Sequence, residues 1–375
     1  MIDWSSLPKE LVILISEKLD SEFYILRFRS VCSVWRGSVP KPHNLPYNFP
    51  LLPKNTILIP SYISKRSFFL VKPHNQFPWL IKISQDLPPR TRLWNPVSFD
   101  LCFHSLFFNS LNFTQFNVLD LGHYFVHHYY FYPVKLVVAT WQRKEQPPSL
   151  LTFNPIGQLA MFRSGDHQLM LIPDGTGYID ICVSKGRPYA VARDGRMVTI
   201  GLDYNICLAA EPILGGNDFK FLVERDDELL LVQFGGGAGS FSFQEHGNDV
   251  VDDNDWKNVD LKIDVFKLDE KKKKKWVELA SLGDRVLFLG DKGDFAVSAS
   301  DLCVAKGNCV IFETNEDVLE PLECEMSVYH LDHRGWVQPL SDYLGYSNLF
   351  WPSPDWTGFR DFQKQLLALK GLCCE

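Results

Sequence analysis

The spacing of apolar residues changes near residue 45 of this chain of 375 residues, and that change most constrains its fold. Before it, Leu11, Ile15 and Leu19 recur at every fourth position, which is typical of a helix with one apolar face. After it, apolar residues form short runs separated by turn residues, which is typical of β-strands. The runs include residues 56–59, 67–71, 135–139 and 229–232, and one of the turns is Arg-Asp-Gly-Arg at residues 193–196. The sequence therefore predicts a small helical segment followed by a long β-domain.

Local signals divide the N-terminal segment into three helices. Pro8 suits the first helical position, because it lacks an N–H group that would be unpaired there. Asp20 and Ser21 can end this helix and cap a second one. A third, short helix would include Val31 and Trp35 and stop before the prolines that follow.

The helical segment needs something outside itself to be stable. A piece of about 40 residues can bury little of its own surface, so it usually depends on a metal, a disulfide or a partner. This segment has a single cysteine, Cys32, and no cluster of metal-ligating side chains. We therefore expect a partner protein to complete its apolar core.

Prolines mark the boundary between the helical segment and the β-domain. Five of them lie between residues 40 and 55, a density typical of a stiff linker. The expected divisions are a helical domain at 1–42, a proline-rich linker at 43–55, the β-domain at 56–350 and a C-terminal tail or helix at 351–375.

Composition and length favour a propeller among the all-β folds. Phe, Tyr and Trp make up 14% of the residues, and aromatic side chains are enriched in strands. Helices of about 10–15 residues do not alternate with the apolar runs, which disfavours a parallel α/β sheet. The β-domain is too long for a single sandwich of about 100 residues, but it suits several four-stranded blades. The sequence echoes at residues 93–96 and 152–155 support repetition and leave the blade number open.

Charge and segment composition limit the classes of partner. The formal net charge of −7 argues against broad nucleic-acid binding, which usually needs a basic face. No stretch approaches the roughly 20 apolar residues of a membrane helix, and the N-terminus lacks the pattern of a signal peptide. We therefore read the nine cysteines as reduced thiols and expect a cytoplasmic or nuclear protein that binds neither nucleic acid nor a membrane.

The sequence contains no recognisable catalytic motif. The glycine-rich stretch at residues 234–240 lacks the Gly-Lys-Ser/Thr ending of a phosphate-binding loop, so we interpret it as a loop between strands. Carboxylate pairs at 226–227 and 252–253 lie in charged turns, where solvation explains them. Neither a nucleophile elbow nor a zinc-binding His-Glu-x-x-His sequence is present. We expect no catalysis and no cofactor.

Two further groups of residues have alternative interpretations. His123 and His127 would share one face of a strand and could begin a metal site, but no further ligands follow at a recognisable spacing, so a structural role is favoured. The five lysines at residues 271–275 fit either a solvated loop, which is favoured, or a nuclear-import signal.

The N-terminal residues resemble an F-box, because a tryptophan, a Leu-Pro pair, a Val-Cys pair and a Trp-Arg pair follow one another at that family's spacing. The resemblance implies a three-helix unit that docks on the Skp-type adaptor of cullin-RING ubiquitin ligases. That adaptor would supply the missing part of the core. The residues that the resemblance assigns to adaptor binding, divided between the adaptor-facing surface and the internal core, are Trp4, Leu7, Pro8, Leu11, Ile15, Leu19, Leu26, Val31 and Trp35.

The remainder of the chain resembles the KIB-type β-propeller of a large plant F-box family. The resemblance is strongest after residue 275 and weaker over residues 55–145. The segments that carry it are 154–155, 185–191, 193–195, 275–290, 295–301 and 306–312. The expected fold is therefore a small three-helix F-box followed by an all-β propeller, an α+β multidomain chain.

Together these resemblances imply a substrate-recognition subunit of an SCF-type E3 ubiquitin ligase, whose propeller recruits a protein substrate for degradation. Such a subunit is not itself an enzyme and acts by holding substrate near the ubiquitin donor. Two alternatives stay open: an F-box scaffold or inhibitor outside ubiquitination, and a propeller that binds a metal or small ligand near His123 or His127.

Overall fold

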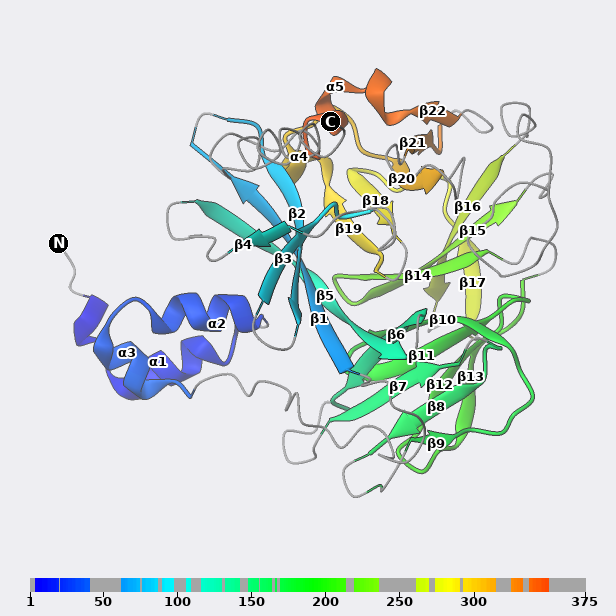
Figure 1. The fold of residues 1–375 in the computed structure, drawn as a ribbon, viewed down its shortest axis with the longest axis horizontal. Coiled ribbons are helices and arrows are strands. Elements are labelled where there is room, and N and C mark those ends of the chain that lie inside the picture. Colours follow the sequence, from blue (N-terminus) through cyan, green and yellow to red (C-terminus); the bar gives the residue numbers. More distant parts are fainter. Residues whose placement is uncertain are drawn as a thin grey trace, which may run out of the picture. The chain divides into compact units, whose positions relative to one another are not determined.

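The computed structural model groups the chain into two compact units, Met1–Leu51 and Leu52–Glu375. Figure 1 shows their helices and strands. The expected linker, the C-terminal tail and an expected strand at residues 56–59 lie outside the described residues. The structure describes residues 4–19, 21–40, 62–74, 76–86, 90–97, 106–108, 116–129, 132–141, 148–154, 156–163, 166, 169–213, 219–235, 261–269, 274–290, 293–314, 325–332 and 337–350.

The first unit contains three short α-helices, as the sequence predicts. The Ser21 hydroxyl accepts a hydrogen bond of 3.1 Å from the Phe23 amide and caps the second helix. The Cys32 sulfur accepts one of 3.5 Å from the Trp35 amide at the start of the third. The elements are the 3₁₀ turn η1 (Trp4–Ser6), α1 (Lys9–Ser16), α2 (Glu22–Arg29) and α3 (Ser33–Ser38).

Two helix starts differ from the sequence-based prediction by one or two residues. Pro8 precedes α1, because its ψ of 140° is extended although its φ of −54° suits a helix. Val31 lies before α3, which begins at Ser33 because Cys32 takes an extended backbone and supplies the cap.

The second unit is built from strands, with short helical turns near its C-terminal end. Predicted runs at residues 67–71, 135–139 and 229–232 lie in β1, β6 and β15 respectively. The elements are β1 (Tyr62–Lys72), β2 (Trp79–Asp86), β3 (Arg90–Trp94), β4 (Leu106–Phe108), β5 (Asn117–Tyr129), β6 (Tyr132–Ala139), β7 (Ser149–Phe153), β8 (Leu159–Phe162), β9 (Met170–Leu171), β10 (Tyr178–Ser184), β11 (Arg187–Ala192), β12 (Met197–Ile200), β13 (Ile206–Ala210), β14 (Lys220–Arg225), β15 (Glu228–Gly235), β16 (Lys262–Asp269), β17 (Lys275–Glu278), β18 (Arg285–Leu289), β19 (Phe295–Ser298), α4 (Ala299–Leu302), β20 (Cys309–Thr314), β21 (Glu325–His330), β22 (Val337–Pro339), η4 (Leu340–Asp342) and α5 (Leu344–Ser347).

These strands form four sheets in which neighbours along the chain usually pair. The sheet orders are β4-β3-β2-β1-β5-β6-β7-β8-β9, β10-β11-β12-β13, β14-β15-β16-β17 and β19-β18-β20-β21-β22. All described pairings are antiparallel except that of β18 with β20. In the first sheet, β5 lies between one set of four strands, β1 to β4, and another, β6 to β9. With the other three sheets, the described strands therefore form five groups.

Contacts between the sheets close them into a ring. Strand β6 lies against β10, β10 against β14, and β14 against β19. Strand β19 in turn lies against β5, the partner of β6. Figure 1 shows the sheets arranged around a common centre. This is the arrangement of a β-propeller, in which each group of strands is a blade.

Turn chemistry explains how consecutive strands reverse. Between β11 and β12, the Asp194 carboxylate accepts a 2.9 Å hydrogen bond from the Arg196 amide. Gly195 takes a φ of +81°, which costs a glycine little and other residues more. The sequence marks this turn in advance, and the structure confirms it.

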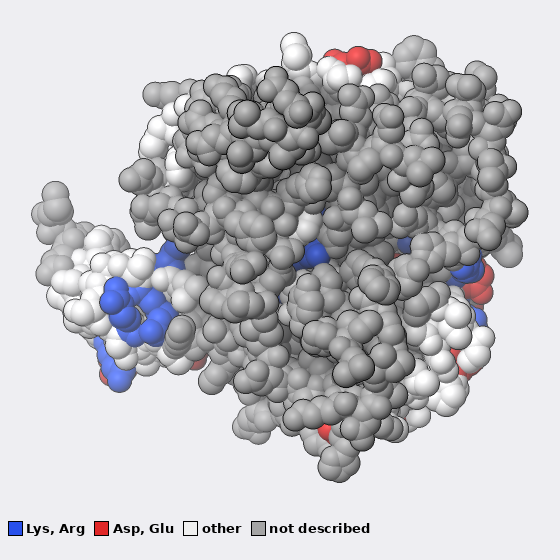
Figure 2. Space-filling view, in the orientation of Figure 1, with Lys and Arg blue, Asp and Glu red and all other residues white. Residues whose placement is uncertain are grey.

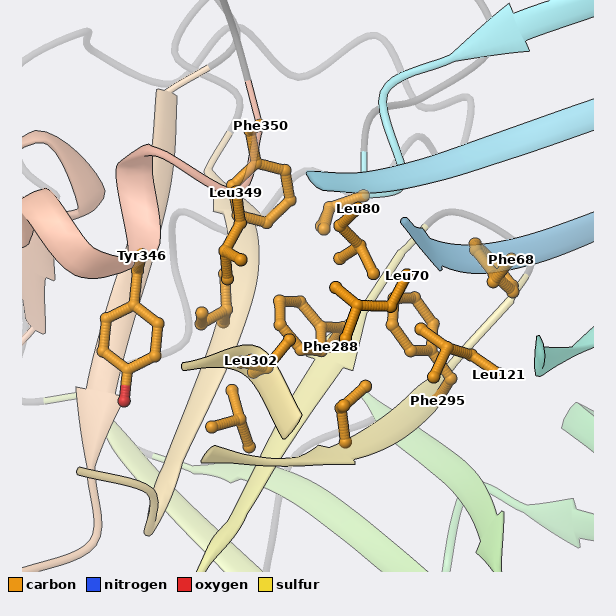
Figure 3. Packing of buried hydrophobic residues seen from close by; sticks show 14 of the residues in the cluster. Phe68, Leu70, Leu80, Leu121, Phe288, Phe295, Leu302, Tyr346, Leu349 and Phe350 are labelled. Carbon is orange, nitrogen blue, oxygen red and sulfur yellow. The ribbon is translucent and has the colours of Figure 1, made fainter. Parts of the chain in front are cut away.

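One large apolar cluster joins the first sheet to the last. Figure 3 shows Phe68 and Leu70 of β1 and Leu80 of β2 packed toward Phe288 of β18 and Phe295 of β19. The segment after α5 is also hydrogen-bonded to the first sheet. The Leu80 amide of β2 donates a 2.9 Å hydrogen bond to the Leu349 carbonyl. The ring of sheets therefore closes through side-chain packing and through the chain that follows the last strand.

Candidate protein-docking surface

The helical unit displays an unusual share of apolar surface. Among the described residues, fourteen large hydrophobic side chains are exposed, and half of them lie in this small unit. The seven are Trp4, Leu11, Leu14, Ile15, Leu26, Val31 and Val34. We call this set the apolar helical surface. Clustered exposed apolar residues are typical of a protein-interaction site.

The geometry of α1 explains why the surface forms. Leu11, Leu14 and Ile15 are spaced three and four residues apart, so they share one side of the helix. Val12 and Ser16 face the interior of the unit, where Val12 is fully buried. The periodic apolar stripe seen in the sequence therefore points outward, and a residue outside that stripe fills the core.

The interior of the helical unit is small. Only Val12, Trp35 and Val39 are buried apolar residues in its described part, and four half-buried side chains pack against them. The Trp35 indole lies 4.3 Å from the Phe28 ring, centroid to centroid, and donates a 3.1 Å hydrogen bond to the Trp4 carbonyl. So small a core contributes little stability by itself, as the sequence predicts.

The nine predicted adaptor-binding residues fall into three groups in the structure. Exposed members are Trp4, Pro8, Leu11, Ile15, Leu26 and Val31; half-buried members are Leu7 and Leu19; Trp35 is buried. The Trp35 side chain presents little surface and holds the helices together through its contacts with Phe28 and Trp4. Adaptor binding by these residues stays a prediction.

The structure adds Leu14 and Val34, which the sequence analysis missed. Leu14 follows Leu11 by three residues, so helical periodicity could have identified it. Val34 has no such signal, because α3 has only six residues and Trp35 beside it is buried.

The helical unit also carries exposed charged residues. Figure 2 shows Lys and Arg side chains gathered on the face of the helical unit that this view presents. Glu10 of α1 lies one turn before Leu14, and Lys18, just beyond the end of α1, follows Leu14 by four residues. An apolar centre with a charged rim is the usual anatomy of a protein interface.

The β-domain contains a second arrangement of interest, a buried group of charges. Lys135 of β6 places its Nζ 2.6 Å from Asp180 Oδ1 and 3.3 Å from Asp294 Oδ2. Asp180 lies in β10, and Asp294 lies just before β19. The sequence analysis missed all three; a lysine inside an apolar strand run was the available signal.

Burial and mutual attraction shift the pKa values in this group. Burial alone would lower the pKa of Lys135, but the two carboxylates outweigh it and raise that pKa above its usual range. Burial raises the pKa of Asp294 to about 7; Lys135 opposes that shift and the Asp180 carboxylate adds to it. Lys135 is therefore charged at neutral pH.

The two histidines of the alternative metal-site interpretation differ in burial. His123 is exposed, while burial lowers the pKa of His127 to about 4, so His127 is neutral near pH 7. The described residues contain no group of three or more His, Cys, Asp or Glu suited to a metal. No helix within the described ranges is long and apolar enough to span a membrane. The stretch at 236–250 and the lysines at 271–273 lie outside them.

Comparison with known proteins agrees with the arrangement of sheets. Residues 47–330 match the family model "KIB1-4 beta-propeller". The F-box protein SKIP23 of Arabidopsis thaliana is 33% identical, with 95% of this chain and 96% of that protein covered. The F-box protein At2g17036 is 32% identical over 95% of each chain. The F-box/kelch-repeat protein At1g64840 is 28% identical, covering 84% of this chain and 85% of that protein. Both are also from Arabidopsis thaliana.

The match to the family model includes most of the β-domain. The similarity to SKIP23 extends over nearly the whole chain, helical unit included. The chain therefore belongs to the plant F-box proteins that carry a KIB1-4 β-propeller.

Proposed function

We propose that this chain is the substrate-recognition subunit of an SCF-type E3 ubiquitin ligase. The three-helix unit would be its F-box and would bind a Skp-type adaptor. The observation that carries this proposal is the apolar helical surface, which lies over a core of three buried residues. A partner that covers this surface supplies the missing burial, at roughly 25 cal/mol per Å² of apolar area.

In this proposal the chain works by proximity. The adaptor connects the F-box to the cullin and its ubiquitin-charged E2, and the propeller holds a protein substrate. Tethering both raises the effective concentration of the substrate lysine at the E2. The chain contributes no catalytic group and no cofactor, and it works in the cytoplasm or nucleus without binding nucleic acid or membrane.

Adaptor binding is tested with a double substitution, Leu11→Asp/Ile15→Asp, in the full-length chain. Both side chains are exposed, so the change places two charges on the apolar helical surface without altering the core. We expect capture of a purified Skp-type adaptor to be lost. The matched control is Phe77→Asp, an exposed apolar residue of the β-domain, which should bind as the unaltered chain does. Adaptor capture that survives the double substitution contradicts the proposal.

Ligase function requires a second measurement, because a scaffold or inhibitor would also bind the adaptor. Substrates are first captured by proximity labelling in cells with the proteasome blocked. Their half-lives are then compared in cells that carry the unaltered chain or Leu11→Asp/Ile15→Asp. A receptor predicts longer half-lives with the variant. Unchanged half-lives for every captured protein would favour the scaffold.

A further inference from the structure

The buried charges of the β-domain lie where the ring of sheets closes. Lys135 belongs to the first sheet and Asp180 to the second, and Asp294 lies in the turn between β18 and β19 of the last. The Leu222 amide of the third sheet also donates to Asp180, at 2.7 Å. One small group of side chains therefore touches all four sheets, and we call it the closure junction.

The two carboxylates of the closure junction are held differently. Asp180 accepts three short hydrogen bonds: 2.6 Å from Lys135 Nζ, 2.8 Å from the Ile181 amide and 2.7 Å from the Leu222 amide. Asp294 accepts two longer ones, both 3.3 Å, from Lys135 Nζ and the Gly290 amide. Hydrogen bonds to a carboxylate stabilise its ionised form, so Asp180 is the better stabilised anion of the two.

Charge balance disfavours ionisation of both carboxylates together. One lysine faces two acids. The side chains of Lys135 and Asp180 are each 8% exposed, and that of Asp294 is 2% exposed. Burial raises the pKa of the neighbouring Cys182 thiol and keeps it neutral, and the ring of Tyr124 packs beside Gly293 in the turn. A fully ionised junction therefore carries one excess buried negative charge, which is costly.

Asp294 is also placed where its ionisation can act on the ring. The first and last sheets share no strand among the described residues, and they meet through the apolar cluster of Figure 3. Lys72 of β1 adds an ion pair of 3.0 Å with Asp301 of α4, but both side chains are partly exposed. The contact of Lys135 Nζ with Asp294 Oδ2, at 3.3 Å, is by comparison buried between these two sheets.

We propose that the closure junction is a proton-sensitive lock, in which uptake of one proton by Asp294 strengthens the contact between the first and last sheets. Loss of that proton leaves an uncompensated charge in the closed ring and weakens the same contact. The propeller is then held more tightly below neutral pH than above it. This inference concerns the β-domain and does not depend on adaptor binding.

The test compares thermal unfolding of the full-length chain and of Asp294→Asn at about pH 5.5 and about pH 8. Asparagine keeps the shape of the neutral acid but cannot ionise. At the higher pH we expect the variant to melt roughly 2–5 °C above the unaltered chain, and at the lower pH the difference should shrink. Other titrating groups are present in both proteins and cancel in the difference. The control, Asp226→Asn, replaces a carboxylate that is 81% exposed and should give no such pattern.

A difference in melting temperature that is the same at both pH values would overturn the proposal. If Asp294→Asn does not fold, hydrogen exchange of the unaltered chain decides. The Leu80 amide bonds to the Leu349 carbonyl across the closure, so its protection factor reports on that contact. After correction for intrinsic exchange, protection should fall between about pH 6 and about pH 8. Equal protection at both pH values contradicts the lock.

Discussion

The indole nitrogen of Trp35 donates a 3.1 Å hydrogen bond to the carbonyl oxygen of Trp4, thirty-one residues earlier in the chain. This bond ties the first turn of the helical unit to its last helix. The Trp4 side chain, a member of the apolar helical surface, stays 60% exposed. A buried tryptophan thus orients an exposed one.

Trp35→Phe should weaken adaptor binding without abolishing it. Phenylalanine keeps the aromatic contact with Phe28 but removes the hydrogen bond to Trp4, at a cost of about 1 kcal/mol. Trp35→Ala also removes the centre of the core, at about 3–5 kcal/mol. We expect the adaptor dissociation constant, measured by calorimetry on the full-length chain, to rise in that order. A Trp35→Phe chain that binds the adaptor as tightly as the unaltered chain would show that the hydrogen bond to Trp4 does not matter for binding.

Leu14→Asp should weaken adaptor binding as strongly as a change at any residue named by the family resemblance. Leu14 is 55% exposed, so its substitution costs the isolated chain little. Burial of a leucine at an interface contributes about 1.5–3 kcal/mol, which corresponds to roughly 10- to 150-fold in affinity. Titration of labelled adaptor measures this, with the exposed Leu208→Asp of the β-domain as control. A Leu14→Asp chain that binds normally would place the adaptor elsewhere.

Lys135→Met should destabilise the β-domain strongly. The substitution leaves Asp180 and Asp294 buried without their cation, and breaking a buried ion pair in this way costs about 3–5 kcal/mol. Urea unfolding followed by circular dichroism measures the loss. The control is Lys306→Met, because Lys306 pairs with Asp332 at the surface and is 55% exposed. A similar small loss in both variants would mean that the closure junction is dispensable.

Acid should destabilise the β-domain through His127. Burial lowers the pKa of this imidazole from 6.5 to about 4. Between these values the unfolded chain binds a proton that the folded chain does not, so stability falls as the pH falls. The full shift corresponds to about 3 kcal/mol. Denaturant unfolding of the unaltered chain and His127→Gln should show a steeper decline between about pH 6.5 and about pH 4 for the unaltered chain. Parallel curves would show that His127 titrates normally.

Gly157→Ala should cost more stability than Gly283→Ala. Both glycines have positive φ, so alanine is strained at each. A Cβ at Gly157 would also lie 2.6 Å from the Tyr178 carbonyl oxygen, whereas a Cβ at Gly283 meets nothing within 4 Å. We expect a loss of about 1 kcal/mol at Gly283 and at least twice that at Gly157. Melting curves of the two variants test the order, and a reversed order would contradict it.

Local elements of this fold were predictable because their causes lie within a few residues. The cap at Ser21 and the turn at Asp194 and Gly195 depend on hydrogen bonds to atoms two residues away. Strands β1, β6 and β15 coincide with apolar runs that are visible in the sequence. The family match confirmed the resemblance to the KIB-type propeller. That resemblance predicted a closed ring of sheets, which no local signal in the sequence specifies.

Which face of a helix is buried was harder to predict from the sequence than where the helix lies. The stripe of Leu11 and Ile15 identifies an apolar face but does not tell whether that face lies inside or outside. Val12, which lies outside that stripe, occupies the core because α2 and α3 pack on its side of α1. In a unit with so small an interior, packing decides which of two apolar faces is covered.

The amino-acid sequence by itself determined the order of helical and β regions, the turns and caps, and the family, because these depend on neighbours along the chain or on motifs within it. Only the tertiary structure decided that Leu14 and Val34 join an exposed apolar surface and that Trp35 does not. It also brought Lys135, Asp180 and Asp294 together across separations of 45 and 159 residues from the lysine. Closure of the ring creates that junction, and a contact that arises from closure has no signature in the local sequence.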